Sequence, residues 1–479
     1  MMVDFCKIFE DKSIQLVSEI AESLGIEAFV VGGYVRDLIL GRPSKDIDIL
    51  TIGKDSSEIL STAVKNKIGK YAHLSVFKTF GTAQVKWGKN ELEFVTARKE
   101  SYRHDSRNPE CEPGTLEDDL TRRDFTLNAM CIRLSCGQKG ELIDLFNGLS
   151  DLENKTLRTP CDPVITFSDD PLRMMRCVRF ASTLEMYIEE NTYNAIVKDS
   201  ERIKIISMER VKDELVKIMK SPRPSVGLYH MLNTGLMKQV LPEIAALSGI
   251  ETRDGRGHKD NFHHTMQVVD STAKVSDNEW LRIAALLHDI GKPKCKKWED
   301  GHGWSFHGHE YVGTKMVPKI FKKLTLSLGN EMAYVQKLVL LHMRPINLIE
   351  DDITDSAIRR LLFEAGDDID DLMILCHADI TSNNALKRER FHKNYENLRE
   401  KMKEIEEKDH IRMFQPPVSG DEIMTTFNLP PCRQVGEIKE KLKDAILDGI
   451  IPNDRNAALE LMHKIAGEMG VTKDESKNG

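Results

Sequence analysis

The segment from Phe29 to Leu50, FVVGGYVRDLILGRPSKDIDIL, constrains the fold and chemistry of this chain more than any other. Its apolar start predicts a short strand, which is followed by a glycine pair and the start of a helix. Asp46 and Asp48 come next, one residue apart. Side chains at positions i and i+2 of a strand lie on the same face of the sheet. Both carboxylates should therefore point to one place.

Two carboxylates on one face suit Mg²⁺, which proteins bind through one or two carboxylates together with substrate phosphates. Gly32 and Gly33, just upstream, would let the backbone approach a triphosphate without side-chain obstruction. Ile47 and Ile49 alternate with the aspartates and are expected to face a core. Either motif alone is common in chains without this function. The two in this order and within one short span predict metal-dependent nucleotidyl transfer.

The bulk properties of the chain bound its class and compartment. Its 479 residues exceed the roughly 250–300 at which single cores stop growing, so we expect several domains. No apolar run is long enough to span a membrane, and the N-terminus lacks the basic start and apolar stretch of a signal peptide. Nine cysteines without a CxxC pair predict reduced thiols rather than a disulfide or zinc framework. We therefore expect a cytoplasmic globular protein.

The formal net charge of −8 limits how the chain could bind nucleic acid. Nucleic-acid-binding proteins usually carry a basic footprint, so any RNA contact must come from local patches and not from the field of the whole molecule. Basic clusters occur at 292–297, 322–323 and 387–403. Each of them also fits a solvated helix face.

Hydrophobic patterning predicts a mixed α/β first part and a helical remainder. Residues 13–24 are expected to be helical. Four short segments are expected to be strands: 28–31, 47–52, 82–87 and 92–97. Residues 100–118 are polar, contain two prolines and are expected to form a mobile loop, after which a helix leads into a strand. After about Pro163 little strand signal remains, and 251–260 and 409–420 are expected to be linkers.

A series of motifs resembles class II tRNA nucleotidyltransferases, the CCA-adding enzymes, and their bacterial poly(A) polymerase relatives. These motifs are GGYVRD at 32–37 with DID at 46–48, RRDFTLNAM at 122–130, DDPLRMMR at 169–176 with RFA at 179–181, and ERVKDE at 209–214. They occur in the family's order, which makes the combination highly specific. The chain departs from the family at Asp169, where the family usually has Glu, so the charge is kept on a shorter stem.

The resemblance implies that Asp46 and Asp48 hold two Mg²⁺ ions. One ion would lower the pKa of the RNA 3′-hydroxyl, and the other would neutralise the triphosphate and the departing pyrophosphate. Glu93 is either a supporting carboxylate or an exposed strand residue. The remaining nucleotide-binding residues of the first two motifs are Gly32, Gly33, Arg36, Arg123, Asp124 and Asn128.

Asp170, Arg173 and Arg176 lie on one face of a predicted helix and would choose the base. A carboxylate can accept from the exocyclic amine of cytosine or adenine, while an arginine donates to the adjacent ring nitrogen. Guanine and uracil present the reverse pattern, and such a site can reject them by roughly 10⁴-fold. Arg176 would reach the phosphates or stack on the base. The alternative is that Asp170 is a helix N-cap with surface arginines behind it.

The polar loop at 103–114 lies where CCA-adding enzymes have a flexible element tied to the switch from C to A. By this resemblance its presence argues against an enzyme that adds only C.

A second set of ligands lies in the helical block from 261 to 380. Imidazoles and carboxylates on successive helices form a mixed N/O set suited to a divalent transition metal, whose identity the sequence does not specify. The sequence HDIGK at 288–292 resembles the signature of HD phosphohydrolases. The resemblance implies the metal ligands His264, His288, Asp289 and Asp379, with the extra pair of two-metal versions at His309 and His342.

Neighbouring histidines leave alternatives open at this site. His263 could replace His264, His307 could replace His309, and His377 is a further candidate. The block is either a working phosphatase or phosphodiesterase that trims phosphorylated RNA ends, or a scaffold that kept its ligands.

We therefore expect an α+β chain with a polymerase-β-like nucleotidyltransferase head followed by an all-helical neck, HD domain and tail. The expected ranges are 1–155 for the head, 156–250 for the neck with its nucleotide-selecting and RNA-binding elements, 251–390 for the HD domain and 391–479 for the tail. The family implies template-independent addition or repair of the 3′-terminal CCA of tRNA from CTP and ATP, with release of pyrophosphate and with the acceptor arm as partner. Alternatives are a poly(A) polymerase, an enzyme that adds only C or only A, or an HD phosphohydrolase whose head binds RNA.

Overall fold

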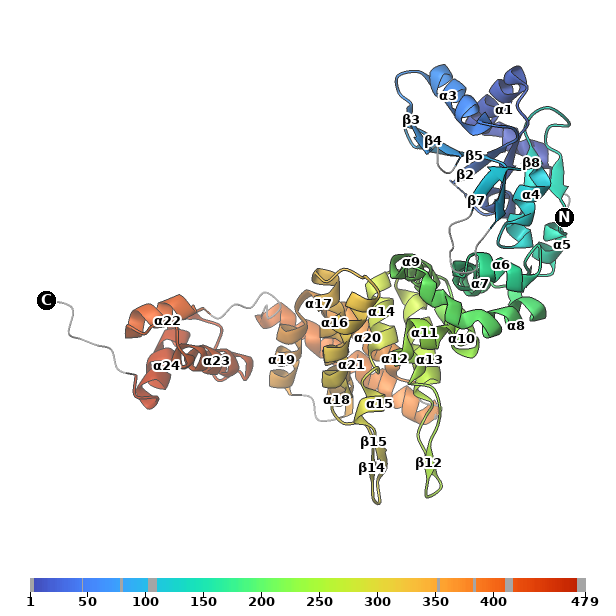
Figure 1. Ribbon diagram of the computed structural model, residues 1–479. Coiled ribbons are helices and arrows are strands. Elements are labelled where there is room, and N and C mark those ends of the chain that lie inside the picture. Colours follow the sequence, from blue (N-terminus) through green and yellow to red (C-terminus); the bar gives the residue numbers. More distant parts are fainter. Residues whose placement is uncertain are drawn as a thin grey trace. The chain divides into compact units, whose positions relative to one another are not determined.

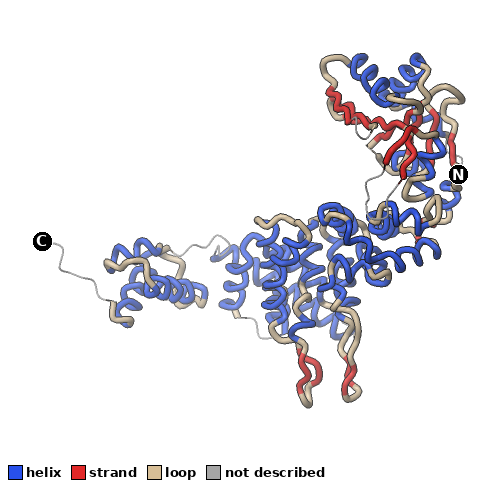
Figure 2. The backbone as a smooth tube through the Cα atoms, viewed as in Figure 1, coloured by secondary structure: helices blue, strands red, loops and turns tan. Residues whose placement is uncertain are grey.

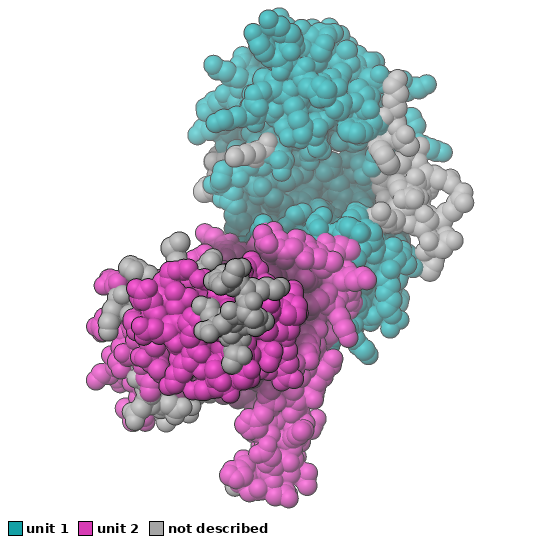
Figure 3. All heavy atoms as spheres, turned by 90° about the vertical axis from the view of Figure 1, so that its left-hand side faces the viewer, with its two compact units in different colours: residues 1–242 teal, residues 243–479 magenta. Residues whose placement is uncertain are grey.

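The computed structural model describes residues 4–44, 46–77, 81–101, 110–350, 354–381, 385–409 and 417–471. The chain divides into two compact units, Met1–Pro242 and Glu243–Gly479 (Figure 3). Across these described ranges, every helix is too short or too polar to span a lipid bilayer.

A seven-stranded mixed sheet forms the centre of the first unit (Figure 2). Its strands are β1 (Ala28–Val31), β2 (Ile47–Thr51), β3 (His73–Phe77), β4 (Thr82–Trp87), β5 (Asn90–Thr96), β8 (Met130–Arg133) and β9 (Leu142–Asp144). They follow the order β3-β4-β5-β2-β1-β8-β9, in which β2 and β5 pair in parallel and the other neighbours are antiparallel. The predicted strands are confirmed to within a residue or two, and β3 and β9 are additions.

Helices pack against this sheet, and one of them begins at Gly33, in the predicted glycine turn. They are α1 (Lys12–Leu24), α2 (Gly33–Ile39), α3 (Ser56–Ile68) and α4 (Leu116–Thr121). The side chain of Asp11 caps α1 by accepting from the Ser13 and Ile14 amides. Ile47 and Ile49 are buried, as predicted. Asp48 and Leu50 point to the opposite face of β2. Leu50 packs there in an apolar cluster with residues of β1, β8 and α4.

The expectation of a mobile loop at 100–118 is wrong at both of its ends. Arg98–Ser101 (β6) pairs antiparallel with Glu110–Pro113 (β7), and the intervening 102–109 lie outside the described residues. The pair places Lys99 opposite Glu112, and such charged strands show no hydrophobic alternation. Thr115 and Asp118 then form a capping box that starts α4.

The rest of the first unit is helical. Its helices are α5 (Gly148–Glu153), α6 (Pro163–Asp169), α7 (Leu172–Thr183), α8 (Glu190–Asp199), α9 (Met208–Met219), α10 (Pro224–Asn233) and α11 (Leu236–Val240). Helix α7 packs against α9 and α10, and a 3₁₀ turn at Thr126–Asn128 (η3) precedes β8. A short parallel pair, β10 (Thr156–Leu157) with β11 (Tyr187–Ile188), adds to the predicted helices.

The second unit is a helical domain with a small helical tail (Figure 1). The domain consists of α12 (Pro242–Ala245), α13 (Asn261–Val275), α14 (Glu279–Leu287), α15 (Lys292–Cys295), α16 (His309–Lys323), α17 (Asn330–Leu341), α18 (Met343–Glu350), α19 (Asp355–Ala365), α20 (Ile369–Asp379) and α21 (Ala385–Asp409). Helix α13 packs against α14 and α20, and α17 packs against α14 and α16. The tail helices α22 (Gly420–Phe427), α23 (Arg433–Leu447) and α24 (Arg455–Glu468) have an apolar core of their own.

Two β-hairpins project from the helical domain, which corrects the expectation of little strand after Pro163 (Figure 1). One consists of β12 (Thr252–Arg253) and β13 (Arg256–Gly257), within the segment predicted to be a linker. The other consists of β14 (Lys297–Glu299) and β15 (Gly303–Ser305). Both are too short to show a period-two pattern in the sequence.

Candidate functional site

The carboxylates predicted from the DID motif lie next to Glu93 in the sheet. Asp48 of β2 is directly opposite Glu93 in the parallel pairing of β2 with β5. Asp46 is exposed just before β2, and Glu93 is exposed on its strand. Gln84 of β4 is paired with Glu93 and donates to one of its carboxylate oxygens at 3.2 Å. We name the group formed by Asp46, Asp48, Glu93 and the preceding glycine turn the head site.

The negative charges of the head site act on one another. Burial is the main cause that raises the pKa of Asp48 to about 6; Arg123 opposes the shift, and the charges of Glu93 and Asp46 add to it. A cation in addition to Arg123 would relieve the repulsion among the three carboxylates. The donor set consists of carboxylate oxygens, which are the ligands that Mg²⁺ prefers, so the residues present fit that ion.

Gly32 brings the backbone between a carboxylate and a guanidinium. Its φ of +80° lies in the region that favours glycine. A Cβ at this position would lie 3.1 Å from Arg123 Nη1 and 3.7 Å from Asp48 Oδ2. The space beside Gly32 is therefore lined by the Arg123 guanidinium and the Asp48 carboxylate. Any larger residue at this position would place its Cβ in that space.

Arg36 and Arg176 meet at a buried pair of polar side chains. Arg36 Nη1 donates to Asn128 Oδ1 at 2.8 Å, and Asn128 Nδ2 donates to Asp124 Oδ1 at 3.0 Å. Asp124 Oδ2 accepts from Arg176 Nε at 2.8 Å. Although burial alone would raise it, Arg176 and the Asn128 hydrogen bond hold the pKa of Asp124 at about 2. The structure thus links α2, the RRDFTLNAM segment and α7 through these four side chains.

The arginines of the head have acidic partners within the protein. Arg36 also pairs in a bidentate manner with Asp37, at 2.9 and 2.8 Å. Arg122 and Arg123 both pair with the fully buried Asp119. These contacts hold the planes of Arg36 and Arg123 at fixed positions beside the glycine turn.

The side chains predicted to choose the base contact protein groups. Asp170, which ends α6, accepts from the Leu172 amide at 3.0 Å, and its other oxygen lies 3.3 Å from Arg210 Nη2. Arg173 donates to the backbone carbonyls of Arg122 and Thr166. Asp170 thus bonds to the first amide of α7, but the N-cap position itself is Pro171.

Phe180 was not singled out in the sequence although it belongs to the RFA motif. The guanidinium carbons of three arginines lie 3.8 to 5.5 Å from its ring centroid: Arg36, Arg176 and Arg179. Phe180 is 4% exposed, and the buried Glu214 of the ERVKDE motif pairs with Arg179. The motifs contain these residues, but which arginines share one ring depends on how α2 and α7 pack.

In the second unit, all six predicted ligands converge, in two groups of three. His264, His288 and Asp379 form one group, and Asp289, His309 and His342 form the other. We name the six together the histidine site. Asp289 lies between the groups, because its Oδ2 is 3.3 Å from His288 Nε2 while its Oδ1 is 3.3 Å from His309 Nε2.

Each imidazole is oriented through its other nitrogen. The Nδ1 atoms of His288, His309 and His342 lie 2.7 to 2.9 Å from the carbonyl oxygens of Ala285, Phe306 and Val339, respectively. A carbonyl can only accept, so each Nδ1 carries a proton, and the Nε2 atoms are left to face the other groups of the site. Nδ1 of His264 is 2.8 Å from the Thr381 hydroxyl. This is the arrangement by which second-shell groups orient metal-bound histidines.

The buried Nε2 of His288 makes no hydrogen bond to any described residue. Although burial alone would lower it, Asp289 and Asp379 raise the pKa of His288 to about 10. Burial lowers the pKa of His342 to about 4, so this imidazole is neutral. The site favours a positive charge among its carboxylates and has a neutral imidazole at His342, which fits a divalent transition metal.

A cavity of about 530 Å³ opens over the first histidine group. Its floor includes His264 and Asp379, and Lys259 and Lys292 line it. The apolar walls are formed by Phe306, Met343, Ile346, Ile380 and Phe391. This volume is in the usual range for small-molecule sites. Lys292 belongs to the HDIGK motif, whereas no sequence signal identified Lys259 or the apolar walls.

The alternative histidines lie elsewhere. His263 is exposed and its Nε2 is 3.3 Å from the amide nitrogen of Gln267. His307 is exposed. His377 of α20 pairs with His392 of α21 and not with the two metal-ligand groups. The structure therefore brings His264 and His309 to the site in preference to their neighbours.

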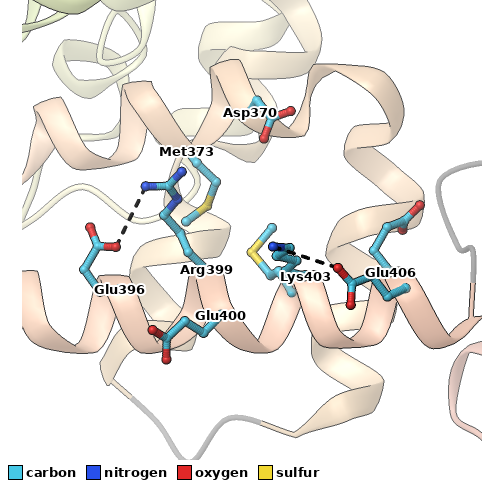
Figure 4. Close-up of a pocket in the computed structure, with 9 residues that line it drawn as sticks. Asp370, Met373, Glu396, Arg399, Glu400, Lys403 and Glu406 are labelled. Atoms are coloured by element: carbon cyan, nitrogen blue, oxygen red, sulfur yellow. Dashed lines mark ion pairs between the residues drawn. The ribbon is translucent and has the colours of Figure 1, made fainter.

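The basic cluster at 387–403 is matched by acidic side chains on the same helix. Figure 4 shows Arg399 and Lys403 of α21 in a charged cavity with Asp370, Glu396, Glu400 and Glu406. Arg399 lies 3.8 Å from Glu396, and Lys403 lies 3.9 Å from Glu407. Among its described residues, this segment behaves as a solvated helix face and not as a net positive patch.

Three family models match successive parts of the chain. They are the Poly A polymerase head domain over residues 28–158, the Probable RNA and SrmB- binding site of polymerase A over 185–247, and the HD domain over 261–384.

Curated relatives extend the similarity to most of the chain. A CCA-adding enzyme of Streptococcus suis is 28% identical over 459 residues, which cover 94% of this chain and 95% of that enzyme. A CCA-adding enzyme of Lactobacillus delbrueckii is 38% identical over 60% of this chain and 67% of its own length. An A-adding tRNA nucleotidyltransferase of Deinococcus radiodurans is 32% identical over 70% of this chain and 76% of its own length.

The fold is also that of a solved structure. A Thermotoga maritima CCA-adding enzyme complexed with tRNA matches with a TM-score of 0.61 at 18% identity, over 98% of this chain and 100% of that one. The predicted α+β class, with its nucleotidyltransferase head and HD domain, is confirmed by these matches.

Proposed function

The chain belongs to the family of tRNA nucleotidyltransferases that includes the CCA-adding enzymes, and we propose that it adds the 3′-terminal CCA to tRNA from CTP and ATP. The reaction joins the RNA 3′-hydroxyl to the α-phosphate of the incoming nucleotide and releases pyrophosphate. The likeness to a CCA-adding enzyme over 94% of the chain supports this choice. The enzyme acts without a template, on the acceptor arm of tRNA, in the cytoplasm.

One observation carries the proposal: Asp48 and Glu93 stand opposite each other in the sheet, beside a glycine turn that faces Arg123. Carboxylates on one side and a guanidinium on the other suit a triphosphate with its metal ions. Asp46, Asp48 and Glu93 would hold Mg²⁺, which when bound activates the 3′-hydroxyl and neutralises the pyrophosphate. Gly32 and the Gly33 amide admit the phosphates close to the backbone, and Arg123 balances their charge.

We assign the choice between bases to two side chains, Asp170 just before α7 and Arg173 in its first turn. In the free protein both already make hydrogen bonds, Asp170 to Leu172 and Arg210 and Arg173 to backbone carbonyls. An incoming cytosine or adenine would replace part of these contacts, while guanine or uracil would leave the exchanged groups unpaired. Arg36, Asp124, Asn128 and Arg176 position α7 relative to the phosphate-binding turn.

We assign these steps to four parts of the chain. Nucleotidyl transfer belongs to residues 1–155, nucleotide selection and RNA contact to 156–250, the histidine site to 251–390 and further support to 391–479.

A primer-extension assay with Mg²⁺ tests the proposal. Three tRNA transcripts ending before CCA, after C and after CC are each given CTP, ATP, both, or GTP with UTP. We expect growth by C, C and then A, with a stop after A and no use of GTP or UTP. An open-ended A ladder would assign the chain to poly(A) polymerases. Growth by A alone after CC would place it with the A-adding enzymes.

The histidine site supports a second function, a metal-dependent phosphohydrolase. The supporting observation is the cavity lined by Lys259 and Lys292 above His264 and Asp379. Lysines there would bind a phosphate, and the metal when bound would polarise it and activate a water. Release of inorganic phosphate or opening of a cyclic phosphate at RNA ends is the activity to measure. Its absence with Mn²⁺, Co²⁺ and Ni²⁺ alike would identify the block as a scaffold.

A further inference from the structure

A second pair of imidazoles lies outside both sites described above. His377 is on α20 and His392 is on α21, and His377 Nε2 is 3.0 Å from His392 Nδ1. Their ring centroids are 4.8 Å apart. Both nitrogens point at each other across two helices, although His377 is exposed and His392 half-buried. The pair is therefore accessible from solvent.

The packing around the pair holds it in place. The ring of Tyr395 lies 4.9 Å from that of His377, and its hydroxyl donates to the Met373 carbonyl at 3.0 Å. Tyr395 is 5% exposed. One side of His377 is thus fixed by a buried ring on α21, which is the helix that also carries His392.

A carboxylate lies one helical turn beyond His392. Glu396 follows it by four residues, and positions i and i+4 of a helix share a face. Glu396 is 62% exposed, and the guanidinium of Arg399 is 3.8 Å away. Such exposed ion pairs are weak, so this carboxylate can exchange Arg399 for another cation.

We propose that His377 and His392 form a surface site for a divalent transition ion of the Zn²⁺ or Ni²⁺ type, and that Glu396 joins it as a third ligand only after its side chain turns from Arg399, because in the structure its carboxylate is not grouped with the two imidazoles. Imidazole nitrogens bind such ions at about 2.0–2.1 Å, so two of them roughly 3 Å apart can share one ion as neighbouring ligands. The ion takes the place of the proton that the two nitrogens otherwise share in a hydrogen bond. Water completes the coordination on the exposed side.

The ion would join α20 to α21 close to the histidine site. Asp379, a member of that site, lies two residues after His377 on the same helix end. The proposed site and the histidine site share no residue, so each can be removed separately. The proposal does not depend on the activity of either proposed enzyme function.

Equilibrium dialysis of the full-length protein against Zn²⁺ or Ni²⁺, with metal analysis, tests the proposal. The main variant is His392→Gln, which keeps a side chain able to hydrogen-bond His377 but removes the imidazole ligand. We expect it to bind one ion fewer than the wild type, or to bind that ion at least about tenfold more weakly. Glu404→Gln, further along the exposed part of α21, is the matched control and should bind as the wild type does.

Thermal unfolding separates metal binding from a folding defect. Without metal, His392→Gln and the wild type should unfold at similar temperatures, and the ion should stabilise the wild type more than the variant, which keeps only the histidine site. In an Asp289→Asn background the ion held by His377 and His392 should remain. Equal stoichiometry and affinity in wild type and His392→Gln, or loss of every ion in Asp289→Asn, would overturn the proposal.

Discussion

The head site and the histidine site both gather carboxylates, but they hold them in different surroundings. At the head site, Asp46 and Glu93 are exposed at the end and on the face of neighbouring strands, and only Asp48 is partly buried. At the histidine site, Asp289 is 1% exposed and is surrounded by four imidazoles. The first site therefore consists of oxygen ligands open to solvent, and the second of buried mixed ligands.

The difference indicates how each site would acquire its metal. Mg²⁺ is bound through few carboxylates and completed by substrate phosphates, so an open carboxylate site suits an ion that arrives with the nucleotide. In the histidine site, three Nδ1 atoms are already fixed by backbone carbonyls. Such second-shell contacts suit an ion that stays bound between turnovers.

The largest expected effect on metal content is at Asp289, whose two oxygens face the two groups of the histidine site. In a His392→Gln background, which leaves only the histidine site to count, Asp289→Asn should lower the transition-metal content of the purified protein by about tenfold or more, because both groups lose a charged ligand. Metal analysis after gel filtration measures this. Asp355→Asn, an exposed change on α19, should keep the full content. Unchanged content in Asp289→Asn would mean that the histidine site does not hold the ion.

Some of this contrast could be predicted from the sequence. The DID motif and the HDIGK motif sit on local elements, a strand end and a helix end, so residue spacing placed Asp48 on its strand and the resemblance to the HD signature identified His288. The structure adds contacts between distant segments. Asp48 meets Glu93 only because β2 pairs with β5 in one register, and polar strands such as β6 and β7 carry no hydrophobic signal for their pairing.

The partners of charged side chains were the least predictable feature. Arg36 was expected to bind phosphate, yet in the free protein it pairs with Asp37 and Asn128. Asp170 was expected to face the base or to cap a helix, yet it bonds to the Leu172 amide from a position before the N-cap and adds an ion pair with Arg210. Motif spacing indicates which residues matter but not which group each one contacts before substrate binds.

The next effect concerns the space beside Gly32. Gly32→Ala should lower kcat/KM for CTP on the order of 10²-fold, because the new methyl group displaces Arg123 or Asp48. Gly41→Ala is the matched control. Its φ of +65° imposes a similar backbone strain, but a Cβ there has no described atom within 4 Å. Equal losses in the two variants would show that strain, and not the space at the head site, is responsible.

The buried pair of Asp124 and Arg176 should contribute to stability. Asp124→Asn is expected to lower the free energy of unfolding by about 2 kcal/mol at neutral pH, because it leaves the partly exposed Arg176 guanidinium without its buried counter-charge. The pKa of Asp124 is held at about 2, below the ordinary carboxyl value. Its contribution should thus be complete above about pH 4 and decline as the pH falls toward 2.

Urea denaturation of wild type and variant at several pH values measures this difference. Asp213→Asn removes an exposed carboxylate on α9 beside Lys212 and should change stability by less than about 0.5 kcal/mol. A difference between Asp124→Asn and wild type that grows as the pH falls below 4 would contradict the assignment.

The smallest expected effect is a gain of stability at the head site. The raised pKa of Asp48, about 6, means that its ionised form costs stability in metal-free protein as the pH rises from about 4 to 6. At pH 8 without metal, Asp48→Asn should therefore be more stable by on the order of 1 kcal/mol, or about 3 °C in Tm. The advantage should vanish below pH 4 and in saturating Mg²⁺. Calorimetry with and without a chelator measures it, and a less stable variant at pH 8 would contradict the proposed charge repulsion.

The most direct measurement compares single-turnover nucleotide addition by Asp48→Asn and Asp289→Asn on one tRNA transcript that lacks CCA. The account predicts that Asp48→Asn lowers the rates of C and A addition by at least about 10³-fold, since a metal ligand at the reacting phosphate is lost. Asp289→Asn should add CCA within about twofold of the wild-type rate. Addition by Asp48→Asn within tenfold of wild type, or its loss in Asp289→Asn, would contradict the assignment of nucleotidyl transfer to the head site.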